Sequence, residues 1–440
     1  MAVLAGIAGG AILVGGHSTA LHPSGSPSPL AAGRSPLIAM VDLAGALATL
    51  DATGRRTALD AEPGVTFGFP TWSPDGSRVA VVRSTALDAS ISMFGVRPGS
   101  PGTTPAPTPV VVYRSSDAPP FYLYWAPDGT RITFLATETD GISLRIAPAD
   151  GSAPLDGSGA GAVIRHGTPL YFDWVTSDRL LLHVGSGNES FLGEIGLDGA
   201  SVGQALGQPG DFRAAVVGAD ARFMAFARGT ATSGELVVAA RDGSAQHTVP
   251  VFGPAAMVFD PAGKSVASIA PDQPTQAGGA FPIGPLRLID AESGVVRTLL
   301  DGTVIGFFWS PDGQTIAALR LQAEDGSTVA ARPIVAAAAI SSPTASPTRP
   351  ASPELHLVFV DVAGGRVRSD RVVRPTSSFI NQFLPYFDQY ALSHRVWSPD
   401  STSILLPVVD ELGRSQLVGL PPDGGDPLLT LAGESGFWSS

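Results

Sequence analysis

The sequence predicts an all-β fold: a single β-propeller of eight four-stranded blades, with seven as the alternative, closed by pairing of its N- and C-terminal strands. Three observations predict it. A phrase built on Trp-Ser-Pro-Asp recurs along the chain, β-forming runs follow each copy, and incomplete units stand at both ends. The composition agrees, because 44% hydrophobic and only 15% charged residues are typical of a chain with a large buried core.

The recurring phrase is the strongest of these signals. Its clear copies are PTWSPDGSRVAVV from Pro70, LYWAPDGTRITFL from Leu123, FFWSPDGQTIAAL from Phe307 and RVWSPDSTSILLP from Arg395, and weaker copies lie around Trp174, Val217 and Phe259. A spacing of about 40 to 50 residues with room for four strands is the period of a propeller blade.

The Pro-Asp-Gly step within the phrase predicts a tight turn between the first two strands of each blade. Pro presets φ, Asp bonds nearby backbone N–H groups, and Gly accepts positive φ. We assign the repeated Asp75, Asp128, Asp312 and Asp400 to these turns and not to calcium, because one carboxylate per blade cannot gather six oxygens.

The two ends of the chain predict how the ring closes. Leu37–Leu59 has the pattern of the second, third and fourth strands of a blade without a first, and the terminal GFWSS has the pattern of a first strand with nothing after it. Joining them would complete one blade and leave no open sheet edge at the junction.

These repeats resemble those of the bacterial TolB-like propellers, which carry Trp-Ser-Pro-Asp-Gly, a strand and an Asp-x-x-Gly turn, and which are related to the propeller domains of dipeptidyl peptidase and prolyl oligopeptidase type enzymes. The resemblance covers nearly the whole chain after Pro36 and implies the fold. It leaves function open, because such blades occur in a periplasmic translocation protein, in accessory domains of peptidases and in other exported proteins. The chain departs from TolB in having no separate N-terminal α/β domain and more than six apparent blades.

The chain divides into an export segment and a propeller domain. Residues 1–35 begin with the apolar MAVLAGIAGGAILVGG and continue as a Ser/Pro-rich tether, which favours a signal peptide or a membrane anchor over a buried apolar arm. Residues 36–440 form the propeller, with a low-complexity loop at about 329–353. We therefore expect an exported protein that is periplasmic, extracellular or anchored at the outer side of the membrane.

Composition and motifs exclude several functions. A net charge of −12 argues against nucleic acid as a partner. With no cysteine, dispersed histidines, no hydrolase elbow and no phosphate-binding loop, the sequence predicts no catalytic residue, no metal and no cofactor.

The candidate ligand-binding residues cluster before the last clear copy of the phrase. By connectivity, the Trp-Ser-Pro-Asp turns share one face of the ring, and the long Arg371–Arg395 loop lies on the opposite, loop-rich face. The candidates are Tyr386, Phe387, Asp388, Gln389, Tyr390, His394, Arg395, Asp173, Tyr171 and Tyr122. Their aromatic rings either line the mouth of the channel or pack between blades. Asp388 either pairs with Arg395 to pin the loop, or His394 and Arg395 position a carboxylate of a ligand.

The function we expect is non-catalytic recognition or scaffolding, in which a monomer binds a protein, peptide or glycan at the cell envelope. One alternative is an enzyme with a carboxylate-based site at the channel mouth. Another is an accessory propeller for a separate peptidase chain. A carboxylate pair converging near a channel-mouth His would favour the enzyme.

Overall fold

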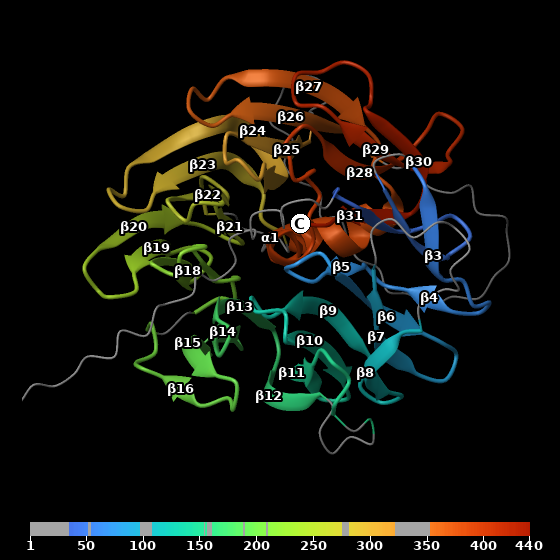
Figure 1. Cartoon of the computed structure of the whole chain (residues 1–440). Helices are drawn as coiled ribbons and strands as arrows, with labels where there is room; N and C mark the ends of the chain where they lie inside the picture. The colour runs from blue at the N-terminus through green and yellow to red at the C-terminus, as the bar shows by residue number, and fades with distance from the viewer. Residues whose placement is uncertain are drawn as a thin grey trace, which may run out of the picture.

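The computed structural model describes residues 35–51, 54–96, 108–153, 155, 161–187, 190–207, 210–274, 281–321 and 353–440. Of the predicted export segment and low-complexity loop, all but residues 35 and 353 lie outside this described part. The described strands form seven antiparallel sheets, one of which serves two blades, so the ring has eight blades (Figure 1). No helix within the described residues is long and apolar enough to span a membrane.

The first four blades run from the closing blade to the middle of the chain, and each is given from its innermost strand outward. Blade 1 holds β31 (Ser435–Trp438), β1 (Ile38–Val41), β2 (Leu47–Leu50) and β3 (Arg56–Asp60). Blade 2 holds β4 (Thr66–Phe67), β5 (Thr71–Trp72), β6 (Arg78–Ser84), β7 (Ala89–Gly95) and β8 (Val110–Ser115), with β4 and β5 both paired to β6. Blade 3 holds β9 (Pro120–Trp125), β10 (Arg131–Glu138), β11 (Gly141–Pro148) and β12 (Ala162–Gly167). Blade 4 holds β13 (Leu170–Thr176), β14 (Arg179–Val184), β15 (Phe191–Gly196) and β16 (Ser201–Val202).

The second four blades complete the ring. Blade 5 holds β17 (Val216–Val217), β18 (Phe223–Gly229), β19 (Gly234–Ala240) and β20 (Gln246–Val251). Blade 6 holds β21 (Ala256–Phe259), β22 (Ser265–Ile269), β23 (Gly284–Asp290) and the first part of β24 (Val296–Trp309). Blade 7 holds the rest of β24, β25 (Thr315–Arg320), β26 (Leu355–Asp361) and β27 (Val367–Val373). Blade 8 holds β28 (Ile404–Val409), β29 (Ser415–Leu420) and β30 (Leu429–Ala432), with Trp397 bridging to Ile404 in place of a longer first strand.

The predicted closure is confirmed. Strand β31 pairs antiparallel with β1, with Phe437 opposite Ala39, so the two ends of the described chain share one sheet. The weak repeat units around Val217 and Phe259 each supply a blade, which decides between the predicted eight blades and the alternative seven.

The repeated phrase joins neighbouring blades as well as turning the chain. The indole Nε1 of each full-copy Trp donates to a backbone carbonyl of the first strand of the preceding blade: Trp72 to Phe437 at 3.0 Å, Trp125 to Thr71 at 3.4 Å, Trp309 to Val258 at 3.2 Å and Trp397 to Phe308 at 3.1 Å. A buried N–H that finds a partner stabilises the joint that it crosses.

The motif carboxylates hold the turns, as predicted. In blade 2, Ser73 Oγ donates to Asp75 at 2.6 Å, and the backbone N–H of Ser77 donates to the same carboxylate at 3.1 Å. Gly76 at the turn has φ 65°. Blade 8 has Ser401 at the equivalent place with φ 60°, a conformation that a residue with a Cβ adopts at a cost.

Candidate functional site

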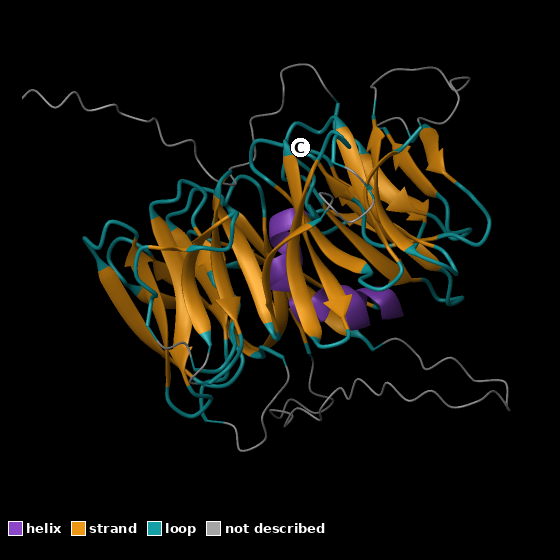
Figure 2. Ribbon diagram, turned by 90° about the horizontal axis from the view of Figure 1, so that it is seen from below, coloured by secondary structure: helices purple, strands orange, loops and turns teal. Residues whose placement is uncertain are grey.

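A helical segment occupies the centre of the ring. It consists of the π-helix η1 (Phe379–Phe383), the 3₁₀-helix η2 (Leu384–Tyr386) and α1 (Phe387–Ser393), and we call these residues, 379–393, the plug. Figures 1 and 2 show α1 inside the ring, and it contacts β9, β21 and β24. The prediction of a loop over Arg371–Arg395 is therefore wrong for most of its length. Phe379, Phe383, Phe387 and Tyr390 recur every three or four residues, which is the apolar spacing of a helix, so the sequence did carry a helical signal here.

The C-terminal end of the plug is held by hydrogen bonds from blades 2 and 3. Thr71 Oγ1 donates to the carbonyl of Ser393 at 2.6 Å, and Tyr122 Oη donates to the carbonyl of Gln389 at 2.9 Å. The last carbonyls of a helix have no partner within it, so Thr71 supplies what the helix lacks at Ser393, and Tyr122 adds a second contact one turn earlier. Tyr122 has φ 47° beside an irregularity in the pairing of β9, so a strained backbone directs its ring toward the plug.

Stacked aromatic rings fix the rest of the plug. The Phe383 ring stacks on Tyr390 with centroids 5.0 Å apart, on Phe379 at 5.2 Å and on Phe437 of β31 at 5.6 Å. Phe387 meets Phe307 edge to face at 5.1 Å. Each such pair adds about 0.5–1.5 kcal/mol to area burial, so the plug is a packed part of the core.

The structure separates the ten predicted site residues by exposure. Tyr386 is 50% exposed, and Gln389, Tyr390 and Arg395 are partly buried. The buried members are Phe387, Asp388, His394, Asp173, Tyr171 and Tyr122. Tyr122 meets Tyr171, Gln389 and Tyr390, so residues far apart in the sequence do come together around the plug.

Two of the buried residues are carboxylic acids with different surroundings. Asp173 of β13 accepts hydrogen bonds from Tyr124 Oη at 3.2 Å, from the Trp174 N–H at 2.8 Å and from the Val217 N–H at 2.8 Å, so it joins blades 3, 4 and 5. Asp388 accepts a bond from the Gln389 N–H at 3.0 Å, and no ion pair joins it to Arg395 or to any other described residue. Desolvation raises the pKa of each carboxyl to about 7.

His394 and Arg395 are engaged by neutral groups. His394 Nδ1 lies 2.7 Å from Ser393 Oγ, and its Nε2 lies 3.4 Å from the Phe69 carbonyl. Burial lowers the pKa of His394 to about 4, so the ring is neutral at pH 7. Arg395 donates to Ser440 Oγ. Among the described residues, the two buried carboxylates form no hydrogen bond with His394.

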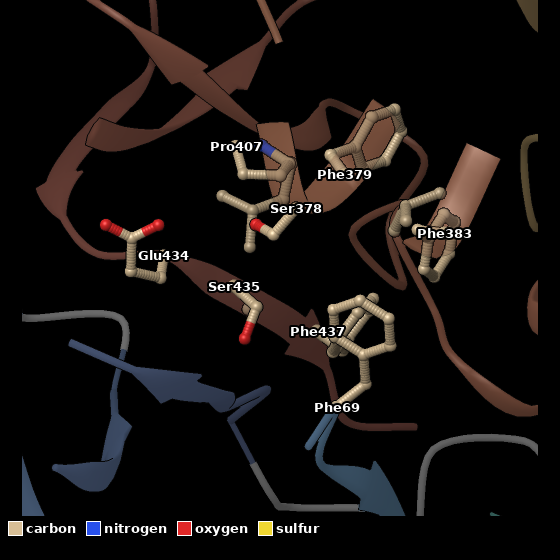
Figure 3. Close-up of a pocket in the computed structure, with 11 residues that line it drawn as sticks. Phe69, Ser378, Phe379, Phe383, Pro407, Glu434, Ser435 and Phe437 are labelled. Atoms are coloured by element: carbon tan, nitrogen blue, oxygen red, sulfur yellow. The ribbon is translucent and has the colours of Figure 1, made fainter. Parts of the chain in front are cut away.

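Sequence reasoning missed a small cleft beside the plug. It lies between the plug, β28 and β31, and Figure 3 shows Glu434 at one end and the rings of Phe69, Phe383 and Phe437 toward the other. Its volume is about 10 Å³, which is the space of about one water molecule. Its residues come from five separate segments, so only the spatial arrangement reveals it.

A second group missed by the sequence is a candidate metal centre. Ligand atoms of Glu138, Asp140 and His166 lie within 4.8 Å of one another, on the β10–β11 turn and the neighbouring β12. His166 Nε2 is 3.2 Å from Asp140, but Glu138 also pairs with Arg145 at 2.7 Å, so one of the three ligands already has a cation. Histidine spacing gave no signal because two of the ligands are acidic and 26 residues or more separate them from the histidine.

The sequence matches no known protein family and no curated protein. Solved structures are similar in fold. The dihydro-heme d1 dehydrogenase NirN is 12% identical over 92% of this chain and 75% of its own, with a TM-score of 0.54. AztD from Citrobacter koseri is 13% identical over 92% of this chain and 98% of its own, with a TM-score of 0.51.

TolB from Acinetobacter baumannii is a more partial match. It is 15% identical over 60% of this chain, with a TM-score of 0.36, and the match spans 65% of its own length. The sheet topology makes this chain a β-propeller, and its structural similarity to TolB and to the other solved structures is distant. The likenesses are all below 25% identity and carry the fold alone.

Proposed function

We propose that this protein is an exported, monomeric propeller of the TolB-like kind that recognises a protein, peptide or glycan at the cell envelope through its loop-rich face. The repeated Trp-Ser-Pro-Asp-Gly phrase supports the TolB-like assignment, and the apolar start of the chain supports export. The single observation that supports the recognition role is the plug, because an ordered aromatic segment of the chain fills the centre of the ring and leaves Asn381, Gln382 and Tyr386 exposed.

The exposed residues of the plug suit recognition. Asn381, Gln382 and Tyr386 are exposed, while Phe383 and Phe387 between and beside them are buried. Tyr supplies contact area with few rotatable bonds, and amide side chains both donate and accept hydrogen bonds, which is the chemistry of adaptable binding surfaces. We call Asn381, Gln382 and Tyr386 the plug surface.

The raised pKa values of Asp173 and Asp388 favour the second candidate, an enzyme, because perturbed carboxyls often mark active sites. Their geometry supports recognition instead. Asp173 is bonded to three blades, Asp388 has no side-chain partner among the described residues, and neither carboxylate meets His394. General acid–base catalysis needs the acid and base within reach of one substrate atom.

The experiment compares partners captured from envelope extracts by the wild-type chain and by a variant carrying Asn381→Ala, Gln382→Ala and Tyr386→Ala. These side chains are exposed, so the variant is expected to keep its fold, whereas replacing the buried Asp388 or His394 would perturb the core. Gln314→Ala, an exposed residue of a Trp-Ser-Pro-Asp turn, is the control. The proposal expects the triple variant to lose partners that the control keeps, and identical partner sets would overturn it.

A further inference from the structure

Three side chains of metal-binding types meet at one edge of blade 3. Glu138 ends β10, Asp140 lies in the tight turn that leads into β11, and His166 lies on β12, the outermost strand (Figure 1). The pairing of β11 with β12 places His166 opposite Ser143, close to the end of the β10–β11 hairpin. The ring of His166 packs against Gly141, where a Cβ would lie 3.4 Å from its Cε1. The fold therefore brings the histidine to two carboxylates that precede it by 26 residues or more.

The ligand atoms have the spacing of a zinc site. His166 Nε2 lies 3.2 Å from Asp140 Oδ1 and 3.6 Å from Glu138 Oε2, and the three atoms all lie within 4.8 Å of one another. Zinc bonds of about 2.0–2.2 Å in tetrahedral directions hold neighbouring ligand atoms roughly 3.3–3.6 Å apart. The separations from the histidine are close to this range, so an ion between the three atoms requires only small rotations of the carboxylates.

The carboxylate of Glu138 is held through one oxygen and directs the other toward the histidine. Arg145 Nη2 donates to Oε1 of Glu138 at 2.7 Å, whereas Oε2 is the atom that faces His166. Arg145 is itself fixed, because its Nε donates to Ser143 Oγ at 2.8 Å and its Nη1 donates to the Gly161 carbonyl at 2.9 Å. A hydrogen-bonded partner behind a ligand orients it for a metal, and hydrogen bonds from Ser143 and Arg145 also lower the pKa of Glu138. This ligand is therefore charged and oriented before an ion arrives.

The chemistry and exposure of the three ligands favour zinc. Two carboxylates beside one guanidinium leave an excess of negative charge, and Asp140 pairs with no arginine among the described residues. An imidazole nitrogen suits zinc, whereas calcium and magnesium require oxygen ligands in larger number. The side chains of Glu138, His166 and Asp140 are 23%, 38% and 79% exposed, so an ion reaches them from solvent without rearrangement of the core. Three protein ligands with an open position are the arrangement of zinc sites that keep a bound water.

We propose that Glu138, Asp140 and His166 bind one zinc ion, with water in the remaining position. The ion joins the end of the β10–β11 hairpin to β12, and so strengthens a strand that has a neighbour on one side only within its described sheet. This inference departs from the expectation of no metal, which depended on histidine spacing and could not detect ligands from two strands and a turn. It does not depend on recognition by the plug, since none of the three ligands belongs to the plug.

The test titrates zinc sulfate into the full-length, chelator-treated protein at pH 7 and follows binding by isothermal titration calorimetry. We expect one saturable site per chain, and binding at least about tenfold weaker in both His166→Gln and Asp140→Ala, because removing a ligand costs no less than removing a residue behind it. Among the described residues, the exposed Asp140 side chain has a polar contact only with His166, so its replacement is expected to leave the fold intact. His247→Gln removes a histidine beside Glu292 on another blade; it is the matched control and is expected to bind zinc as wild type does.

Two further measurements sharpen the outcome. Excess zinc is expected to raise the thermal unfolding midpoint of the wild type and of His247→Gln but not that of His166→Gln, because an ion bound only by the folded state stabilises it. Calcium and magnesium are expected to bind at least about tenfold more weakly than zinc. Equal zinc affinity of His166→Gln and wild type, or no saturable zinc binding by wild type, would overturn the proposal and leave these residues as ion pairs. Equal affinity for calcium would overturn the choice of zinc.

Discussion

Two sectors of the ring hold their blades together in different ways. Where the full Trp-Ser-Pro-Asp phrase occurs, an indole N–H crosses to the preceding blade, as Trp397 does to Phe308. In blade 4 the phrase is degenerate, the Nε1 of Trp174 has no hydrogen-bond partner, and the carboxylate of its neighbour Asp173 bonds the blades on both sides. The tryptophan hydrogen bond between blades is uncharged at every pH, whereas the hydrogen bonds of Asp173 depend on a carboxyl group that titrates. A blade can therefore lack the full Trp-Ser-Pro-Asp motif where the hydrogen bonds of a buried acid connect it to its neighbours.

The largest expected effect is at the carboxylate joint. Asp173→Ala leaves the N–H groups of Trp174 and Val217 and the hydroxyl of Tyr124 without their acceptor, and should lower the free energy of unfolding by about 3 kcal/mol at pH 5. Urea denaturation measures this. Asp178→Ala, an exposed acid of the same blade, should stay within about 0.5 kcal/mol. A loss below about 1 kcal/mol for Asp173→Ala would mean that the joint is not carried by this residue.

The second effect is on pH dependence. The pKa of Asp173 and that of Asp388 are raised to about 7, so between about pH 4 and 7 the folded protein holds more protons than the unfolded chain and stability falls as pH rises. The pKa of His394 is lowered to about 4. Between about pH 4 and 6.5 the unfolded chain therefore holds more protons at this residue than the folded protein, and this contribution makes stability rise with pH.

Removing one of the acids should therefore change the slope. Asp388→Asn is expected to make the fall less steep by about 1.4 kcal/mol per pH unit, the effect of one proton, between about pH 5 and 6.5. Chemical denaturation at several pH values measures the slope, and Trp397→Phe should leave it unchanged. An unaltered slope in Asp388→Asn would show that this carboxyl does not titrate in the folded protein as described.

The third prediction compares tryptophans. Trp397→Phe removes a buried hydrogen bond and leaves the Phe308 carbonyl without it, whereas Trp174→Phe removes an N–H that already has no partner. Both changes lose the same volume, so Trp397→Phe should be more destabilising by about 1–2 kcal/mol. Equal losses in urea denaturation would contradict the role of the indole N–H in joining blades.

The smallest effect concerns the turns. Ser401→Gly relieves a positive φ but loses the bond that Ser401 Oγ accepts from the Asp312 N–H, so we expect a gain of no more than about 1 kcal/mol. The reverse change, Gly313→Ser, places a Cβ at φ 69° and should cost about 1 kcal/mol. Thermal unfolding compares the two, and a stabilising Gly313→Ser would rule out backbone strain as the difference between these turns.

The repeats made the ring predictable, and the site was predictable only in part. The Trp-Ser-Pro-Asp-Gly phrase, its spacing and the incomplete units at the ends carry local turn chemistry and strand pattern, so blade number and closure followed from them. The plug was missed although Phe383, Phe387 and Tyr390 have helical spacing, because Pro385 interrupts the run and a helix this short is stable only when it packs on the blades, as Phe387 does on Phe307. Asp173 acquires its role from hydrogen-bond partners in two other blades, more than 40 residues away, so the local sequence does not show it.

The most direct test of recognition asks which face of the ring meets the partner. A photoreactive phenylalanine analogue is placed at position 386 on the plug surface, or at position 314 on the opposite turns, and each protein is irradiated in intact cells. We predict cross-linked adducts from position 386 and none above background from position 314. Adducts confined to position 314, or none from position 386, would contradict recognition through the loop-rich face.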